Sequence, residues 1–120
     1  MSSTHGSHWL EREDIGDVTV VRIKVSKLGI DDTTREIFHQ INTLVEIGRP
    51  NLVLNLTAPE YLPSLALGKL VMLNRRTQAA NGRLALCTLA PMAAEALEAT
   101  HLAPLFNIYR TEEEALRSFA

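Results

Sequence analysis

Hydrophobic residues along the chain follow two spacings, one typical of strands and one typical of helices. Short apolar runs rich in valine, isoleucine and leucine predict buried or half-buried strands. The clearest run covers residues 51–56, and its nearly continuous apolar character is typical of a central parallel strand. The predicted strands cover residues 8–13, 18–25, 51–56, 83–89 and 105–109.

Longer segments carry apolar residues three or four positions apart, which is the spacing of a helix that buries one face. Thr33, with Glu36 three residues later, has the pattern of a capping box, and Gly48 marks the end of this first helix. A second helix opens at Ser64, because Pro63 before it has the fixed φ that suits a helix entrance.

The later helices have equally clear limits in the sequence. The second helix is expected to stop at Asn81 and Gly82, since both residue types adopt the left-handed conformation that ends helices. Pro91 suits the first turn of a third helix, which runs to about Thr100. A second capping-box pattern opens a terminal helix over residues 111–119.

The predicted order is strand, strand and helix, followed by alternating strands and helices. Gly16 and Asp17 predict a hairpin turn between the first two strands, and the alternation predicts parallel strands joined by right-handed crossovers. The fold class is therefore predicted to be α/β, a mixed, mostly parallel sheet begun by an N-terminal antiparallel hairpin, with four helices. Residues 1–7 are expected to be flexible, 8–120 to form a single domain, and 27–30 to be a loop or a short extra strand.

Composition excludes several classes of function. The chain has 120 residues, 46% of them hydrophobic, which is enough for one core and too little for two comfortable domains. A net charge of -2 and a pI near 6.1 provide no basic footprint for nucleic acid. The closest basic pair, Arg75 and Arg76, is interpreted as part of the solvated face of a helix.

Cellular location and thiol chemistry follow from a few residues. Cys87 is the only cysteine, so no internal disulfide is possible, and its apolar strand favours a buried, inert thiol over a reactive one. No apolar run approaches the roughly 20 residues that span a bilayer. The first residues also lack the apolar core of a signal peptide, so we expect a cytoplasmic protein.

The sequence contains no pattern that predicts a catalytic site. The six glycines are isolated and form no phosphate-binding loop. His5 and His8 have no matching cluster of acids or cysteines for a metal, and His39 and His101 are single histidines. The carboxylates at 112–114 lie in the first turn of a predicted helix, where the helix dipole favours them. We therefore expect a binding or regulatory module rather than an enzyme, with no catalytic residue, metal or cofactor.

Ser64 is the residue with the most informative position. The first amides of a helix are unpaired and carry partial positive charge, so this end favours an anion such as a phosphate. The turn beyond the carboxyl end of a strand is also where ligands and partners bind in open α/β sheets. Two interpretations remain open at this point, since a serine at a helix start is either a site of modification or simply the cap of its helix.

With these elements in order, residues 9–119 resemble the STAS domain family, and within it the bacterial anti-sigma factor antagonists. In that family an apolar strand ending in Asp-Leu-Ser or similar is followed by an aromatic residue, an aliphatic residue, Asp-Ser-Ser-Gly or Asp-Ser-Thr-Gly, Leu-Gly and a helix. Here the strand ends in Asn-Leu-Thr at 55–57, and Tyr-Leu-Pro-Ser-Leu-Ala-Leu-Gly follows at 61–68. The Asn-Gly turn at 81–82 and the segment at 111–116 are further similarities.

The resemblance implies a STAS-like fold and a regulatory switch without catalytic activity. In the family, the first serine of the motif is phosphorylated by a partner anti-sigma kinase, and the unphosphorylated form binds that kinase and releases the sigma factor. Ser64 stands at that serine. The implied partner is an anti-sigma factor or GHKL-type serine kinase, and the implied oligomeric state is a monomer or weak dimer. The expected partner-binding residues are Glu60, Tyr61, Leu62, Pro63, Ser64, Leu65, Leu67 and Gly68.

Four positions depart from the family pattern. Pro63 replaces the acidic residue of the motif, Leu65 its second hydroxyl residue and Ala66 its glycine, while Asn55 replaces the acid at the strand end. These departures motivate a second hypothesis, a STAS interaction module that scaffolds a signalling assembly and is never phosphorylated. A third hypothesis, an enzyme or ligand carrier that uses a pocket at the strand ends, rests on the topology alone.

Overall fold

The structure of the protein is a computed structural model that describes residues 2–6, 9–29 and 31–120. Within these residues the strands form one sheet in the order β1-β2-β3-β4-β5-β6. The strands are β1 (Ser2–Gly6), β2 (Leu10–Ile15), β3 (Val18–Ile23), β4 (Asn51–Asn55), β5 (Arg83–Cys87) and β6 (Asn107–Tyr109). The helices are α1 (Asp32–Glu46), α2 (Ser64–Ala79), α3 (Pro91–Ala99), α4 (Glu112–Arg117) and the short 3-10 helix η1 (Ala103–Leu105).

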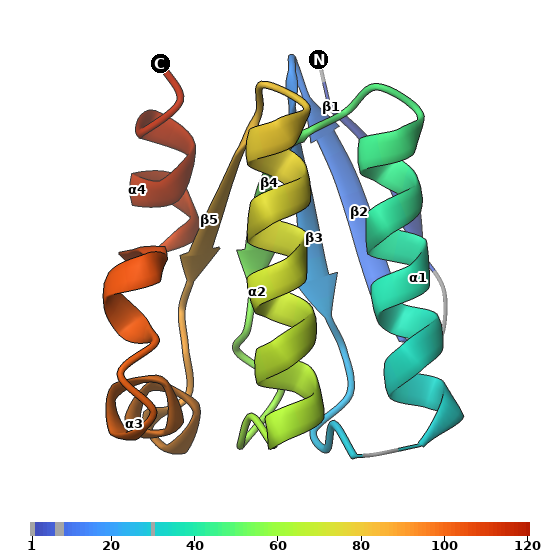
Figure 1. Ribbon diagram of the computed structural model, residues 1–120. Coiled ribbons are helices and arrows are strands. Elements are labelled where there is room, and N and C mark those ends of the chain that lie inside the picture. The colour runs from blue at the N-terminus through green and yellow to red at the C-terminus, as the bar shows by residue number, and fades with distance from the viewer. Residues whose placement is uncertain (1, 7–8, 30) are drawn as a thin grey trace.

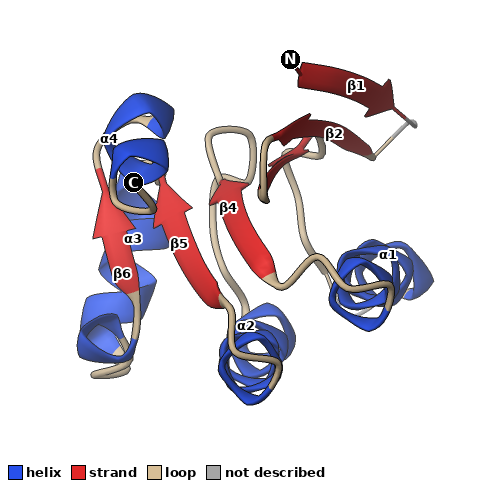
Figure 2. Cartoon of the chain, turned by 90° about the horizontal axis from the view of Figure 1, so that it is seen from above, coloured by secondary structure: helices blue, strands red, loops and turns tan. Residues whose placement is uncertain are grey.

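The sheet is mixed, as the sequence predicted. The first three strands pair in an antiparallel manner, and β3 through β6 are parallel. Each parallel strand lies next to the one before it, so every right-handed crossover moves across the sheet in the same direction and leaves its helix on the same face. Figure 2 shows α1, α2 and α3 on one face and α4 on the other.

Alternation along the strands produces a hydrophobic core on each face. On the face of α1, α2 and α3, the strands contribute fully buried leucines, among them Leu52, Leu54, Leu84 and Leu86. On the face of α4, the residues are smaller. The core there comprises Val18, Val20, Val53, Ala85, Cys87 and Ala115. Because strand side chains alternate between faces, one register fixes both cores.

The ends of the elements confirm several predictions. Gly16 has a φ of +60° in the turn between β2 and β3, and Asn81 has a φ of +63° just after α2. Thr111 caps α4, because its side chain accepts a hydrogen bond from the Glu114 amide. α3 begins at Pro91, as predicted, and ends at Ala99, one residue before the predicted end at Thr100.

Other limits differ from the predictions. α1 begins at Asp32 rather than Thr33, because Asp31 is the N-cap and accepts from the Thr34 amide. β6 covers only Asn107–Tyr109, since η1 occupies residues 103–105, and α4 ends at Arg117. Residues 27–29 contain no strand, so that segment is a loop.

The N-terminal segment also differs from the expectation of a flexible tail. β1 (Ser2–Gly6) pairs along its whole length with β2. Strand pairing uses backbone groups and needs no apolar side-chain pattern, so the small polar residues of this segment gave no signal for it. The predicted strand start at His8 lies outside the described residues, as do Met1, Ser7 and Ile30.

Gly82 positions β5 through a close approach to the start of β4. A Cβ built on Gly82 would lie 2.3 Å from the carbonyl oxygen of Pro50. The Arg83 amide donates to that same carbonyl at 3.1 Å. Only glycine leaves room for this approach, so the Asn-Gly pair both ends α2 and lets β5 begin beside β4.

Candidate functional site

The candidate site lies where β4 ends and α2 begins. Figure 1 shows the carboxyl ends of the parallel strands and the N-termini of α1 and α2 at the same end of the molecule, the lower end in that view. Residues 56–63 form the connection between Asn55 and Ser64. This is the edge at which open α/β sheets present ligand and partner sites.

Asn55 organises the first part of this loop with both ends of its amide. Its side-chain oxygen accepts from the backbone amide of Thr57 at 2.9 Å and from the Thr57 hydroxyl at 2.6 Å. Its side-chain nitrogen donates to the Glu112 carboxylate at 2.6 Å. An acid at this position has no proton to donate and would face Glu112 as a like charge, which gives a physical reason for asparagine here.

The second part of the loop is fixed by the core and by a neighbouring loop. Leu56 and Leu62 are both completely buried, and Pro59 is buried between them. The Glu60 amide donates to the Ser26 carbonyl, in the connection between β3 and α1, at 2.9 Å. The backbone of this loop is therefore fixed both by its buried side chains and by the neighbouring loop, and α2 begins directly after it.

Ser64 is the first residue of α2, and it is exposed. The N-cap is Pro63, with φ −70° and ψ 168°, and no side chain caps the helix. The interpretation of Ser64 as a mere cap is therefore wrong, because the preceding residue holds the cap position. The first helical hydrogen bond runs from the Leu67 amide to the Pro63 carbonyl at 3.0 Å, which leaves the amides of residues 64–66 outside the helical ladder.

The charge at this helix start differs from that of two other helices. α1 has Asp31 as its cap and Asp32 in its first turn, and the first turn of α4 is entirely acidic. The first turn of α2 contains no acidic residue. Its partial positive charge is therefore not offset by a side chain of that turn, and a dianionic phosphate on Ser64 would be favoured there.

The eight predicted partner-binding residues divide into three groups. Glu60, Tyr61, Ser64 and Gly68 are exposed, and Pro63 and Leu65 are half-buried. Leu62 and Leu67 are 0% and 6% exposed and belong to the core, which corrects their assignment as contact residues. Burial of the aliphatic positions of the motif is what holds the exposed ones in place. Ala66 is also completely buried, so its methyl group faces the core and not a partner.

A charged cluster that sequence reasoning missed lies between β2, β3 and the start of α4. The Arg22 guanidinium donates to Glu112 at 2.7 and 2.8 Å, to Glu13 at 2.9 Å and to Glu11. The Arg22 hydrogen bonds, against the opposing effect of burial and with help from Asn55, lower the pKa of Glu112. Arg22 and Glu112 are 90 residues apart, so no local pattern signals the pair.

The remaining predictions about reactive groups concern single residues. Cys87 is buried as expected, and burial raises the pKa of its thiol. His39 and His101 are exposed. Within residues 2–6, 9–29 and 31–120 no group of three or more histidine, cysteine, aspartate or glutamate side chains is arranged to hold a metal ion. In the same residues no helix combines the length and the apolar character needed to cross a membrane.

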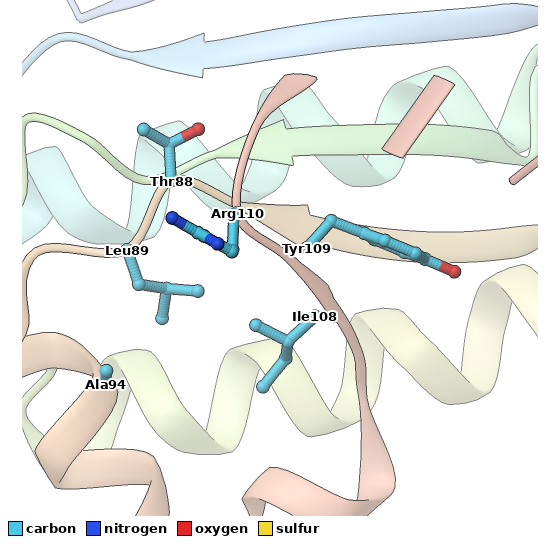
Figure 3. A pocket seen from close by; sticks show the side chains of 6 residues that line it. All are labelled: Thr88, Leu89, Ala94, Ile108, Tyr109 and Arg110. Atoms are coloured by element: carbon cyan, nitrogen blue, oxygen red, sulfur yellow. The ribbon is translucent and has the colours of Figure 1, made fainter. Parts of the chain in front are cut away.

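A shallow pocket lies between α3 and the ends of β5 and β6 (Figure 3). Its volume is about 370 Å³, and its lining consists of Thr88, Leu89, Ala94, Ile108, Tyr109 and Arg110. None of the predicted partner-binding residues lines it. The strand-end pocket considered for a ligand carrier is therefore separate from Ser64.

Solved structures with the same fold include several anti-sigma factor antagonists. A STAS-domain anti-sigma factor antagonist from Planctomyces limnophilus has a TM-score of 0.78 and 23% identity, over 91% of this chain and 96% of that one. An anti-sigma factor antagonist from Mycobacterium paratuberculosis has a TM-score of 0.75 and 26% identity, over 98% and 93%. The phosphorylated form of the Bacillus cell fate determinant SpoIIAA has a TM-score of 0.66 and 20% identity, over 100% of both chains.

The comparison with family models is decisive for membership. None of the curated proteins compared with the chain is similar enough to count as a match. The model of the STAS domain matches residues 10–115, which includes every strand from β2 to β6 and all of α1, α2 and α3. The chain therefore belongs to the STAS domain family.

Proposed function

We propose that this protein is an anti-sigma factor antagonist of a bacterial signalling pathway that regulates transcription in the cytoplasm. In this proposal it binds an anti-sigma factor that is also a GHKL-type serine kinase, and phosphorylation of Ser64 by that kinase ends the binding. The protein itself catalyses nothing and is a target of its partner. Membership of the STAS family and the structural likeness to anti-sigma factor antagonists support the proposal.

The observation that carries the proposal is the state of Ser64. Ser64 is exposed at the start of α2, where no side chain caps the helix and the first turn contains no acidic residue. A phosphate there would add about −1.5 to −2 charges and three strong acceptor oxygens within reach of unpaired amides. The fold tolerates this change because the loop is held by buried Leu56 and Leu62 and not by the Ser64 hydroxyl.

Transfer of labelled phosphate tests the proposal directly. The purified protein is incubated with radiolabelled ATP and the GHKL-type kinase of its host, and the modified residue is located by peptide mapping. We expect incorporation into the wild type and none into Ser64→Ala. Ser26→Ala is a matched control, because Ser26 is also exposed and its hydrogen bond with the loop is made by its backbone carbonyl, which the substitution keeps. Incorporation that persists in Ser64→Ala would refute the assignment of Ser64.

A second candidate function is a STAS scaffold that is never phosphorylated. The observation that favours it is the pair of half-buried apolar residues, Pro63 and Leu65, on either side of Ser64, where the family carries polar groups. Under this alternative, the charge-mimicking substitution Ser64→Asp leaves the affinity for the binding partner unchanged. A large loss of affinity in Ser64→Asp would exclude the scaffold and favour the switch.

A further inference from the structure

Helix α2 differs in charge from the rest of the molecule. It carries Lys69, Arg75 and Arg76 and no acidic residue, although the whole chain has a net charge of -2. The helices α1, α3 and α4 all contain acidic residues. The positive charge of α2 is therefore concentrated on one element of an otherwise acidic protein.

Unlike five arginines elsewhere in the chain, the three cations of α2 form no ion pair with a carboxylate among the described residues. Within the described residues, ion pairs form between carboxylates and Arg12, Arg22, Arg35, Arg49 and Arg117. Lys69, Arg75 and Arg76 take part in none of them. Arg75 and Arg76 are exposed and Lys69 is half-buried. Their charges are free to attract an external acidic group.

The solvent side of α2 has a definite pattern. Ser64, Gly68 and Met72 succeed one another at intervals of four residues and form a small and apolar line along the helix. Met72 is 47% exposed, and a Cβ built on Gly68 would meet no atom within 4 Å, so this line is open to contact. Arg76 continues this line by four residues, and Lys69 and Arg75 lie on either side of Met72. We call this surface the α2 cationic face, defined by Ser64, Gly68, Lys69, Met72, Arg75 and Arg76.

We propose that the α2 cationic face binds an acidic amphipathic segment of a partner protein, with an apolar side chain over Gly68 and Met72 and carboxylates on the flanking cations. A protein fits better than nucleic acid, because only three cations are present and the centre of the face is apolar. The inference rests on the proposed function in one respect, namely that a partner binds at the Ser64 end of α2.

This placement gives the phosphate on Ser64 a physical means of releasing the partner. At a rise of about 1.5 Å per residue, Ser64 lies about 6 Å along the axis from Gly68 and about 7.5 Å from Lys69. These separations are within the screening length of about 8 Å at physiological salt. A dianionic group on Ser64 therefore lowers the positive potential at the Ser64 end of the α2 cationic face, around Lys69, and repels an acidic partner there.

The test uses a defined probe and does not depend on the host kinase. The probe is a synthetic amphipathic peptide as long as α2, 16 residues, with leucines on one side and glutamates on both flanks. Backbone amide shifts of the isotope-labelled protein are followed by NMR during titration. We expect the largest shifts at Gly68, Met72 and Arg75, and an affinity that falls as salt is raised.

Charge reversal distinguishes peptide binding at the α2 cationic face from a general effect of net charge on the affinity. The double variant Arg75→Glu and Arg76→Glu is expected to weaken peptide binding by about tenfold or more. The matched control is Arg35→Glu with Arg117→Glu, which changes the net charge equally and alters two exposed arginines on other helices. Unchanged circular dichroism of both double variants shows that the fold is retained.

Three results would overturn the inference. These are shifts that map away from α2, an equal loss of affinity in the control variant, and tighter binding of a matched oligouridylate RNA or of phosphatidylserine vesicles than of the peptide at the same face. The result of the phosphate-transfer assay does not depend on the result of the peptide titration. If Ser64 accepts no phosphate but the peptide binds the α2 cationic face, only the proposed function is refuted. If Ser64 is phosphorylated but the peptide shifts lie elsewhere, only this inference is refuted.

Discussion

The Asn55 side-chain nitrogen donates to the Glu112 carboxylate at 2.6 Å and so joins the end of β4 to the start of α4 across 57 residues of sequence. The same Asn55 side chain accepts two hydrogen bonds from Thr57 in the loop that leads to Ser64. One side-chain amide therefore links the start of α4 with the loop that leads to the candidate site.

Restoring the acid typical of the family at position 55 is expected to destabilise the protein. Asn55→Asp removes the donor to Glu112 and places two carboxylates together, with an expected loss of about 1–3 kcal/mol in the free energy of unfolding at neutral pH. Urea denaturation measures the change. In a Glu112→Gln background the penalty should shrink, because the like charge is gone. An equal penalty in both backgrounds would show that the Asn55–Glu112 contact is not its cause.

The stability of the protein is expected to fall in acid because of Glu112. Its pKa is lowered from the ordinary value of 4.5, chiefly by hydrogen bonds from Arg22. A lowered pKa in the folded state contributes stability that is present above the unfolded pKa and is lost as pH falls through the folded one. Melting temperatures measured from pH 7 down to pH 3 should therefore decline less in Glu112→Gln than in the wild type. The control Glu113→Gln removes a carboxylate that is 79% exposed and should follow the wild-type curve.

A negative charge at Ser64 is expected to stabilise the isolated protein. Ser64→Asp places an anion at the uncapped N-terminus of α2, which is worth about 0.3–1 kcal/mol at low ionic strength and less in high salt. The same residue introduced at the other end of the helix, in Gln78→Asp, should destabilise by a similar amount. Chemical denaturation at two salt concentrations measures both. Stabilisation by both substitutions would contradict an effect of the helix dipole.

Two glycines are expected to respond in opposite directions to alanine. Gly82→Ala brings a methyl group to 2.3 Å from the Pro50 carbonyl oxygen, so the backbone must move, at a cost of about 1–3 kcal/mol. Gly68→Ala adds a methyl group in open space within α2 and should stabilise by about 0.5–1 kcal/mol, because alanine is the better helix former. Thermal unfolding of the two variants tests the contrast, and similar changes in both would refute it.

Much of the fold follows from local sequence alone, because the features that define it act over a few residues. Asn81 ends α2 in the left-handed conformation, and Thr111 caps α4, as their residue types predicted. The apolar run of β4 and the alternation of strands with helices likewise predicted the parallel part of the sheet. The placement of Ser64 at the start of α2 belongs to the same category, since Pro63 and the following apolar period are local signals.

Other predictions were wrong where two local signals compete or where pairing is long-range. Asp31 and Thr33 are both favourable cap types, and Asp31 holds the cap position, where its side chain accepts from the Thr34 amide. β1 has no apolar pattern, and only its backbone pairing with β2 makes it a strand. Leu62 and Leu67 look like possible contact residues in the sequence, but the packing of the loop places them in the core.

The sequence by itself determined the order of the elements, the fold class and the position of Ser64 at a helix start, because propensity, capping and periodicity act through neighbouring residues. Only the tertiary structure decided which groups meet around that site. The contact of Asn55 with Glu112 and the pairing of Arg22 with carboxylates of β2 and α4 join elements far apart in sequence. Among the described residues, no carboxylate forms an ion pair with the cations of α2, which also depends on how the elements pack. Such contacts form only when the sheet register and the packing of helices on it are fixed.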